Sequence, residues 1–326
     1  MRAVLCRQWG GPETLAIEDV ASPRAGAGEL VVDVKAAGVN FPDVLIIQGK
    51  YQIKPPLPFT PGAELAGVVK EAGGGVADLK PGDPVIAYVT TGAFAEECRV
   101  PATHAVKMPA GIEFATGAAF TLTYGTSWHA LKDRAQLRAG ETLLVLGAGG
   151  GVGLAAVELG KAMGARVIAA ASSEDKLAVC RARGADETID YSREDLRERV
   201  REIAGERGVD VVYDPVGGPL SEPALRSTGW RGRFLVIGFA SGEIPRLPIN
   251  LPLLKGSSIV GVYWGDWMRR EPERARAEMG ELLGWLRDGR VKPHVSGRYP
   301  LARTAEALVA MTQRSVTGKI VVEPEA

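Results

Sequence analysis

The chain has 326 residues, of which 46% are hydrophobic, and its 39 basic side chains balance 39 acidic ones. This length suggests two domains. A neutral chain without a basic run argues against nucleic acid as the main partner, and neither a membrane span nor a signal-peptide pattern is evident. The three cysteines, Cys6, Cys98 and Cys180, stand singly and far apart, which excludes a disulfide framework or a CxxC metal knuckle and indicates a cytoplasmic protein.

Residues 1–122 contain short apolar runs separated by glycine- and proline-rich turns. The runs cover residues 4–6, 30–34, 65–71 and 85–88. Short apolar segments at this spacing predict an antiparallel, barrel-like β domain. From about residue 115 the pattern becomes helical, and after residue 141 strands and helices alternate.

Residues 141–171 predict a strand, a glycine turn, a helix and a second strand. The first strand is expected at 143–146, the helix at 154–163 and the second strand at 166–170. In such a unit, side chains at the turn would keep a pyrophosphate from the N–H groups at the helix start. This pattern predicts a dinucleotide site whose turn consists of Gly147, Gly150, Gly151, Val152 and Gly153.

The residues after the second strand bear on which dinucleotide binds. An NAD site usually has an acid there that bonds the ribose 2′-hydroxyl. Here Ala170 and Ala171 are followed by Ser172 and Ser173, with Lys176 just beyond. Hydroxyls and an ammonium suit a 2′-phosphate, so NADPH is expected. An ordinary helix N-cap followed by a surface lysine is the alternative reading.

Further strands are expected at 187–189, 209–213, 233–237 and 258–262, with a helix at 193–204, and they complete a six-stranded doubly wound sheet. The last 60 or so residues hold a helix at 272–288 and a strand at 319–322. They are too few for a third domain, so they are expected to rejoin the first. The fold class is therefore α/β. Its parts are a β domain at 1–122, a nucleotide domain at 123–264 and a C-terminal return at 265–326.

Three segments carry a resemblance to a known family. They are residues 36–51 (AAGVNFPDVLIIQGKY), 61–69 (PGAELAGVV) and 147–153 (GAGGGVG). The whole chain resembles the medium-chain dehydrogenase/reductase superfamily, and more closely its zinc-free quinone oxidoreductase branch, which includes zeta-crystallin. This resemblance implies a Rossmann domain beside a GroES-like β-barrel-type domain. It also implies a homodimer that pairs the edge strand at 258–262 with its two-fold mate.

The resemblance bears on zinc. Alcohol-dehydrogenase relatives place a cysteine in the segment matching residues 38–43 and a histidine just before the glutamate matching Glu64. This chain has Asn40 and Ala63 at those positions, and it lacks the lobe of four closely spaced cysteines. Since zinc needs about four nitrogen, sulfur or oxygen ligands, no metal is expected.

The branch's site residues map onto this chain as follows. Asn40 and Tyr51 match catalytic positions beside the nicotinamide. Tyr191 joins Ser172, Ser173 and Lys176 around the 2′-phosphate. The other cofactor contacts implied are Thr126, two loops (Gly238, Phe239, Ala240 and Ser241; Val262, Tyr263 and Trp264) and Arg314. Singly, each of these residues also has a plain structural explanation, such as a helix cap or a solvated charge.

Two reactions remain open. The first is electron transfer from NADPH to a quinone. The second is reduction of an activated C=C bond in an enone or enoyl thioester, for which Tyr51 matches a presumed proton donor. A third reading is a binding protein without turnover, since zeta-crystallin relatives serve in the lens or bind RNA. The neutral charge and intact glycine turn count against that reading.

Overall fold

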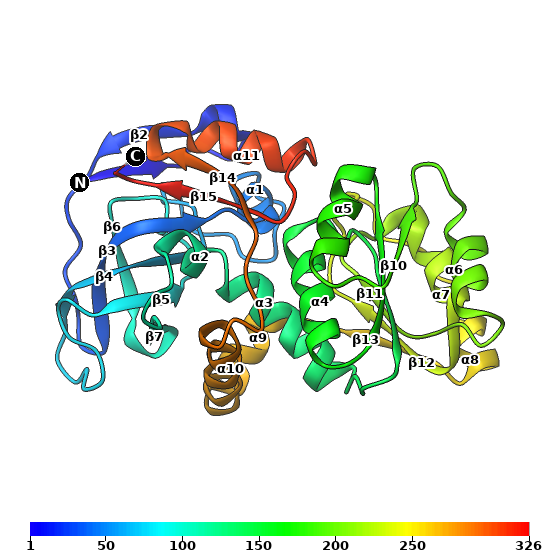
Figure 1. Ribbon diagram of the computed structural model, residues 1–326. Helices are drawn as coiled ribbons and strands as arrows, with labels where there is room; N and C mark the ends of the chain where they lie inside the picture. The colour runs from blue at the N-terminus through cyan, green and yellow to red at the C-terminus, as the bar shows by residue number, and fades with distance from the viewer. Residues whose placement is uncertain (326) are drawn as a thin grey trace. The chain divides into compact units, whose positions relative to one another are not determined.

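Residues 1–325, which the computed structural model describes, form two units (Figure 1). The first unit combines Met1–Leu122 with the C-terminal segment that starts at Lys292, and the second is Thr123–Val291. None of the described helices combines the length and apolar character needed to cross a bilayer.

The elements of the first unit are mainly strands. In chain order they are β1 (Arg2–Leu5), β2 (Ala16–Asp19), β3 (Glu29–Gly38), α1 (Phe41–Ile47), β4 (Glu64–Ala72), β5 (Pro84–Tyr88), β6 (Glu97–Pro101), β7 (Ala105–Lys107), α2 (Phe114–Ala118), β14 (Val295–Pro300), α11 (Thr304–Thr312) and β15 (Lys319–Glu323). Strands β1 and β2 form a separate antiparallel pair.

The seven-stranded sheet of this unit has the order β14-β15-β3-β4-β5-β7, and β6 pairs with β3. The pairs are antiparallel, as predicted, except for the parallel pair β14–β15. Leu30, Val32 and Val34 alternate along β3 and enter one buried cluster, since side chains on one face of a strand recur at every second residue. Strand β15 pairs with the end of β3, which brings the C-terminal segment next to residues 37 and 38.

The second unit alternates strands and helices. They are α3 (Thr121–Trp128, which starts in the first unit), a π-helix (His129–Arg134), β8 (Thr142–Val145), α4 (Gly151–Ala162), β9 (Arg166–Ala171), α5 (Glu174–Ala182), β10 (Glu187–Asp190), α6 (Leu196–Ala204), β11 (Val209–Asp214), α7 (Ser221–Ser227), β12 (Thr228–Val236), α8 (Asn250–Lys255), β13 (Ser258–Gly261), α9 (Trp264–Arg270) and α10 (Pro272–Arg287).

Its sheet has the order β10-β9-β8-β11-β12-β13, and every pair is parallel. Helices α4 and α5 cover one face, and α6, α7 and α8 cover the other (Figure 1). This doubly wound sheet and the β-rich first unit confirm the predicted fold class. Because all six strands run in one direction, their carboxyl ends meet at a single edge, where ligands of such sheets bind.

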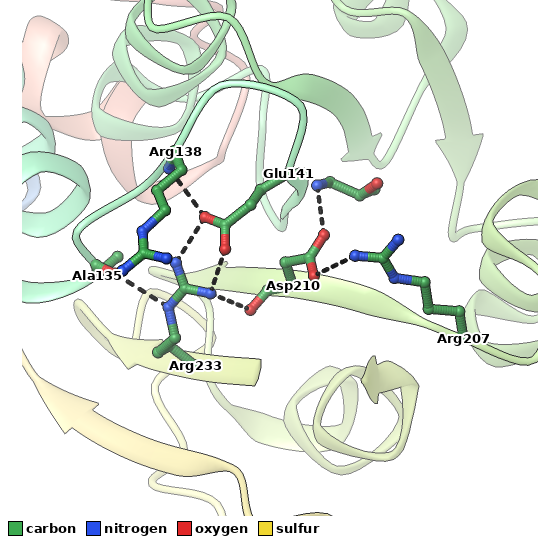
Figure 2. Close-up of polar contacts among 7 residues, drawn as sticks. Ala135, Arg138, Glu141, Arg207, Asp210 and Arg233 are labelled. Atoms are coloured by element: carbon green, nitrogen blue, oxygen red, sulfur yellow. Dashed lines mark hydrogen bonds and ion pairs between the residues drawn. The ribbon is translucent and has the colours of Figure 1, made fainter. Parts of the chain in front are cut away.

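A polar cluster ties the opposite, amino edge together (Figure 2). The guanidinium of Arg233 on β12 donates to both carboxylate oxygens of Glu141 (2.9 and 2.7 Å) and to the carbonyl of Ala135 (3.0 Å). Burial by itself would raise the pKa of Glu141. The bonds from Arg233 and from the backbone N–H of Arg138 together have the larger effect, so the pKa is lowered. Asp210 on β11 accepts the N–H at the start of β8 (2.8 Å). These bonds hold the amino ends of β8, β11 and β12 in register.

The C-terminal return starts later in the structure than residue 265, where the sequence predicts it. Helices α9 and α10 belong to the second unit, and the chain rejoins the first only at Lys292. The cause is aromatic packing: Trp285 meets Trp128 edge-on, with ring centroids 4.9 Å apart, and Trp267 stacks on His129 at 4.2 Å. Tryptophans bury large apolar areas, so these two ring contacts decide where α9 and α10 pack.

Candidate functional site

The glycine turn joins β8 to α4 at the carboxyl edge of the parallel sheet. Gly147 has a φ of +56°, a left-handed conformation that favours glycine. A Cβ at Gly153 would lie 2.3 Å from the carbonyl oxygen of Gly147, so the helix approaches the turn as closely as only glycine permits. Gly150 is the N-cap of α4, and no side chain caps this helix. The first-turn N–H groups of Gly151 and Val152 therefore suit an anion such as a pyrophosphate.

The four residues predicted around the 2′-phosphate gather beside this turn. Ser172 and Ser173 follow β9, and Tyr191 follows the neighbouring strand β10, with its N–H bonded to the last carbonyl of β9 (3.1 Å). The aliphatic stem of Lys176 lies over the turn, because a Cβ at Gly149 would come within 2.7 Å of Lys176 Cβ. The two serines, the tyrosine and the stem of the lysine thus belong to one segment of the sheet edge.

Thr126 is half-buried on α3, close to the start of α4. Its neighbour Ser127 donates a hydrogen bond to the carbonyl of Val152 (2.9 Å). On its other side, Gly125 meets the indole of Trp264, since a Cβ at this glycine would lie 2.7 Å from Trp264 Cζ2. The structure therefore brings Thr126, Trp264 and the glycine turn together.

Residues 238–241 and 262–264 follow β12 and β13 and so belong to the same sheet edge. The first loop is held by backbone bonds from Ala240 to Pro215 O (3.0 Å) and from Ser241 to Val216 O (2.8 Å). The rings of Phe239 and Tyr263 are exposed. All the predicted cofactor contacts of the second unit therefore lie at or beside this edge.

The sequence reasoning missed the loop after β11, residues 215–218. The loop is held by Asp214, the last residue of β11. This buried carboxylate accepts bonds from the N–H groups of Val216 (2.8 Å) and Gly217 (2.9 Å) and from Ser221 Oγ (2.6 Å). The pKa of Asp214 is raised, because the effect of burial exceeds the opposing effect of these three bonds. Val216 lies against the glycine turn, with its Cγ2 2.8 Å from a Cβ built at Gly147. The available signal was the glycine pair Gly217-Gly218, which follows the end of an apolar strand by three residues.

Asn40 lies in the first unit, between β3 and α1, in a buried polar network. Its Nδ2 donates to Glu64 Oε1 (2.8 Å) and to Gly38 O (3.3 Å), and its Oδ1 accepts from the ammonium of Lys319. Asn40 is 3% exposed and Glu64 is 1% exposed. Both Nδ2 hydrogens are therefore committed to the protein, whereas Oδ1 accepts the bond from Lys319 and faces the first turn of α1, which Asn40 caps.

Asp43, in the first turn of α1, completes this network. Its Oδ2 accepts the N–H of Asn40 (2.8 Å), whereas its Oδ1 has no hydrogen-bond partner among the described residues. Burial raises the pKa of Asp43 to about 7, because the bond from Asn40 and the charge of Lys319 only partly offset the loss of hydration.

Tyr51 and Arg314 also lie in the first unit. Tyr51 follows α1 and is half-buried against the hydrophobic core. Arg314 follows α11, is exposed and has a φ of +56°, which is uncommon for a residue other than glycine. The predicted site residues thus fall into two groups: Asn40, Tyr51 and Arg314 in the first unit, and the others in the second.

The residues at the position of the relatives' zinc do not fit that metal. Within residues 1–325, no three or more His, Cys, Asp or Glu side chains come together to hold an ion. Asn40 and Ala63 offer neither thiolate nor imidazole, and the ammonium of Lys319 lies 2.8 Å from Glu64 Oε1. This ammonium would repel a second cation. We assign no step to a metal.

Two family models match the chain: the alcohol dehydrogenase GroES-like domain at residues 26–110 and the zinc-binding dehydrogenase at residues 151–283. A quinone oxidoreductase-like protein 2 homolog of Nematostella vectensis is 39% identical over 325 residues, covering 98% of this chain and 88% of its own. Human quinone oxidoreductase is 33% identical over 326 residues, covering 98% and 97%.

Among solved structures, the Escherichia coli quinone oxidoreductase complexed with NADPH superposes with a TM-score of 0.91 at 30% identity, covering 99% of this chain and 100% of that one. These similarities extend over both units and agree with the resemblance carried by the sequence motifs. The chain therefore belongs to the medium-chain dehydrogenase/reductase superfamily, among its quinone oxidoreductases.

Proposed function

We propose that this protein is an NADPH-dependent oxidoreductase whose acceptor is a quinone. The observation that carries the proposal is the glycine turn with its uncapped helix and the stem of Lys176 beside it. The end of β9 is followed by Ser172 rather than by the acid typical of NAD sites. Relatives named quinone oxidoreductase, one of them solved with NADPH, support the same assignment.

The chain's residues suit this cofactor in a definite way. The first-turn N–H groups of α4 would receive the pyrophosphate, and Lys176, Ser172 and Tyr191 would bind the 2′-phosphate. Thr126 and the loops at 238–241 and 262–264 would line the remainder of the cofactor site. When bound, NADPH supplies the hydride.

In the first unit, Asn40 and Tyr51 are the proposed catalytic residues, and Arg314 is a proposed cofactor contact. Because the Nδ2 hydrogens of Asn40 are committed to Glu64 and Gly38, we assign its function to Oδ1, which would accept a bond from the cofactor or acceptor. Tyr51 would present its ring to the nicotinamide.

A second candidate acceptor is an activated C=C bond. The half-buried Tyr51 phenol favours it, because hydride addition to the β-carbon leaves an α-carbon that must be protonated. A quinone can take its protons from water. The test is NADPH oxidation by the purified protein with quinones, enones and enoyl-CoA thioesters side by side. Fastest turnover of a quinone supports the proposal, and turnover of enones or thioesters alone would replace it with the second candidate.

We also propose a cytoplasmic homodimer. Strand β13 is at the edge of the second unit's sheet, and Ile259 on it is 39% exposed. An apolar edge strand is a pairing hazard unless another chain covers it, and a two-fold mate would do so.

The three cysteines are buried free thiols, which suits a reducing compartment.

A further inference from the structure

We propose that Lys319 is a positioning residue: its buried ammonium fixes the side-chain amide of Asn40 in one orientation and so sets the acceptor atom that this residue presents. The inference deepens the proposed function, because it rests on Asn40 acting at the reacting site. Lys319 and Asn40 are 279 residues apart in the chain, and no sequence motif connects them.

Each hydrogen of the Lys319 ammonium has an acceptor. Lys319 Nζ donates to Val39 O (2.8 Å), to Glu64 Oε1 (2.8 Å) and to Asn40 Oδ1. An ammonium has three hydrogens, so these three acceptors use all of them. The side chain of Lys319 is 4% exposed, which leaves water little access to compete for these bonds.

These neighbours allow only one orientation of the amide. With Oδ1 toward Lys319, the Nδ2 group of Asn40 faces the Glu64 carboxylate and a carbonyl. The flipped amide would direct its NH₂ group at an ammonium and its oxygen at a carboxylate. Both contacts would be repulsive in a buried, weakly screened environment. The charges of Lys319 and Glu64 therefore determine the orientation together.

The network also reaches the end of the first unit. The second oxygen of Glu64, Oε2, accepts the N–H of Leu122 (2.8 Å) in the first turn of α3, the helix that carries Thr126. Lys319 itself is held by a bond from its N–H to His294 O (2.8 Å). One ammonium thus connects β15, the turn after β3, the start of β4 and, through Glu64, the start of α3.

The first experiment is a double-mutant cycle on kcat with Lys319→Met and Asn40→Ala, using the best acceptor from the screen. Lys319→Met should lower kcat by about tenfold or more, because a misoriented group loses its transition-state contact. NADPH affinity should stay within about threefold. In the Asn40→Ala background, the same change should lower kcat by less than about twofold. Equal losses in both backgrounds would overturn the proposal.

The control is Lys35→Met. Lys35 lies on β3 and is ion-paired with Glu325 on the surface, so this variant removes a lysine and an ion pair without touching the network. It should keep wild-type kcat. If it loses as much activity as Lys319→Met, the loss reflects a general effect of removing a lysine, and the proposal fails.

The second experiment needs no turnover and so separates this inference from the proposed reaction. In ¹⁵N NMR, the Asn40 Nδ2 hydrogens should exchange slowly with solvent in the wild type and markedly faster in Lys319→Met. If the single variant does not fold, Lys319→Met combined with Glu64→Gln removes both buried charges and serves instead. Unchanged protection of the Asn40 amide in the variant would refute the positioning role whatever the acceptor is.

Discussion

The side chain of Lys176 lies on the backbone of Gly149, so closely that a Cβ on this glycine would approach Lys176 Cβ to 2.7 Å. The helix after β9 and the turn after β8 therefore meet through a lysine stem and a glycine. This contact places Lys176 at the edge where the sequence predicts the 2′-phosphate of NADPH, and it motivates the first prediction.

Lys176→Ala should weaken NADPH binding by about 1–3 kcal/mol, because it removes a charge-assisted bond to the 2′-phosphate. NADH lacks this phosphate, so its affinity should hardly change. Dissociation constants for both cofactors, measured by fluorescence titration, test this. Equal weakening of NADPH and NADH would show that Lys176 does not recognise the 2′-phosphate.

Gly153→Ala should reduce affinity for both cofactors and destabilise the fold by about 1–3 kcal/mol. The added methyl would lie 2.3 Å from Gly147 O, so the helix or the turn must move. Gly280→Ala on α10 is the matched control, since nothing lies within 4 Å of its added Cβ. The control should be neutral or stabilising by up to about 1 kcal/mol. Urea unfolding and cofactor titration report both effects, and a Gly153→Ala variant as stable as the control would contradict this.

Asp43 should make stability fall as the pH rises. Its pKa is raised to about 7 by burial, whereas an unfolded aspartate titrates near pH 3.9. The folded state thus holds this proton more tightly, and the favourable contribution is lost between about pH 4 and pH 7, with a slope of up to about 1.4 kcal/mol per pH unit. Lys319 on β15 and Glu64 on β4 are the charges that face this carboxyl.

Urea unfolding of the wild type and Asp43→Asn from pH 5 to pH 8 measures this contribution. The stability of the wild type relative to the variant should decline up to about pH 7 and then level off. Asp83→Asn is the control: the Lys107 bond lowers the pKa of Asp83, so it stays ionised throughout this range. Parallel wild-type and Asp43→Asn profiles would mean that Asp43 does not titrate there.

Tyr51→Phe should separate the two candidate reactions. If a C=C bond is reduced and Tyr51 is the acid, losing its hydroxyl should cost roughly 10²–10⁴-fold in rate. With a quinone acceptor the ring remains and the loss should be small. The measurement is kcat on one quinone and one enone with both proteins. High wild-type turnover of the enone and a large loss there would rule out the quinone as the natural substrate.

The wild type should sediment as a dimer at micromolar concentration. Ile259→Lys should weaken the dimer by about tenfold or more, because it places like charges on two edge strands related by a two-fold axis. Ile17→Lys is the control, since Ile17 is similarly exposed but lies on β2 in the first unit. A wild-type monomer, or equal dissociation of both variants, would count against pairing through β13.

The nucleotide-binding sheet could be predicted from the sequence because its signals are local. Apolar runs of strand length, a glycine turn and a following helix all lie within residues 141–171, and the structure has β8, α4 and β9 there. Ser172 was located in the same way, as a residue that follows the second strand at the carboxyl edge of the sheet, whereas Tyr191 was assigned through the family resemblance. The edge position of β13 follows from the same strand order.

Contacts between distant segments were decided only by the tertiary structure. The sequence around Lys319 predicts a final strand. Nothing near this residue in the chain indicates that its ammonium donates hydrogen bonds to Asn40 and Glu64. The sequence predicted α10 as a helix, but the unit to which this helix belongs is decided by the ring contact between Trp285 and Trp128. Hydrophobic period and turn residues specify an element through neighbours a few positions away. Burial, pKa and the orientation of an amide depend instead on which elements pack together, and that is decided by the fold as a whole.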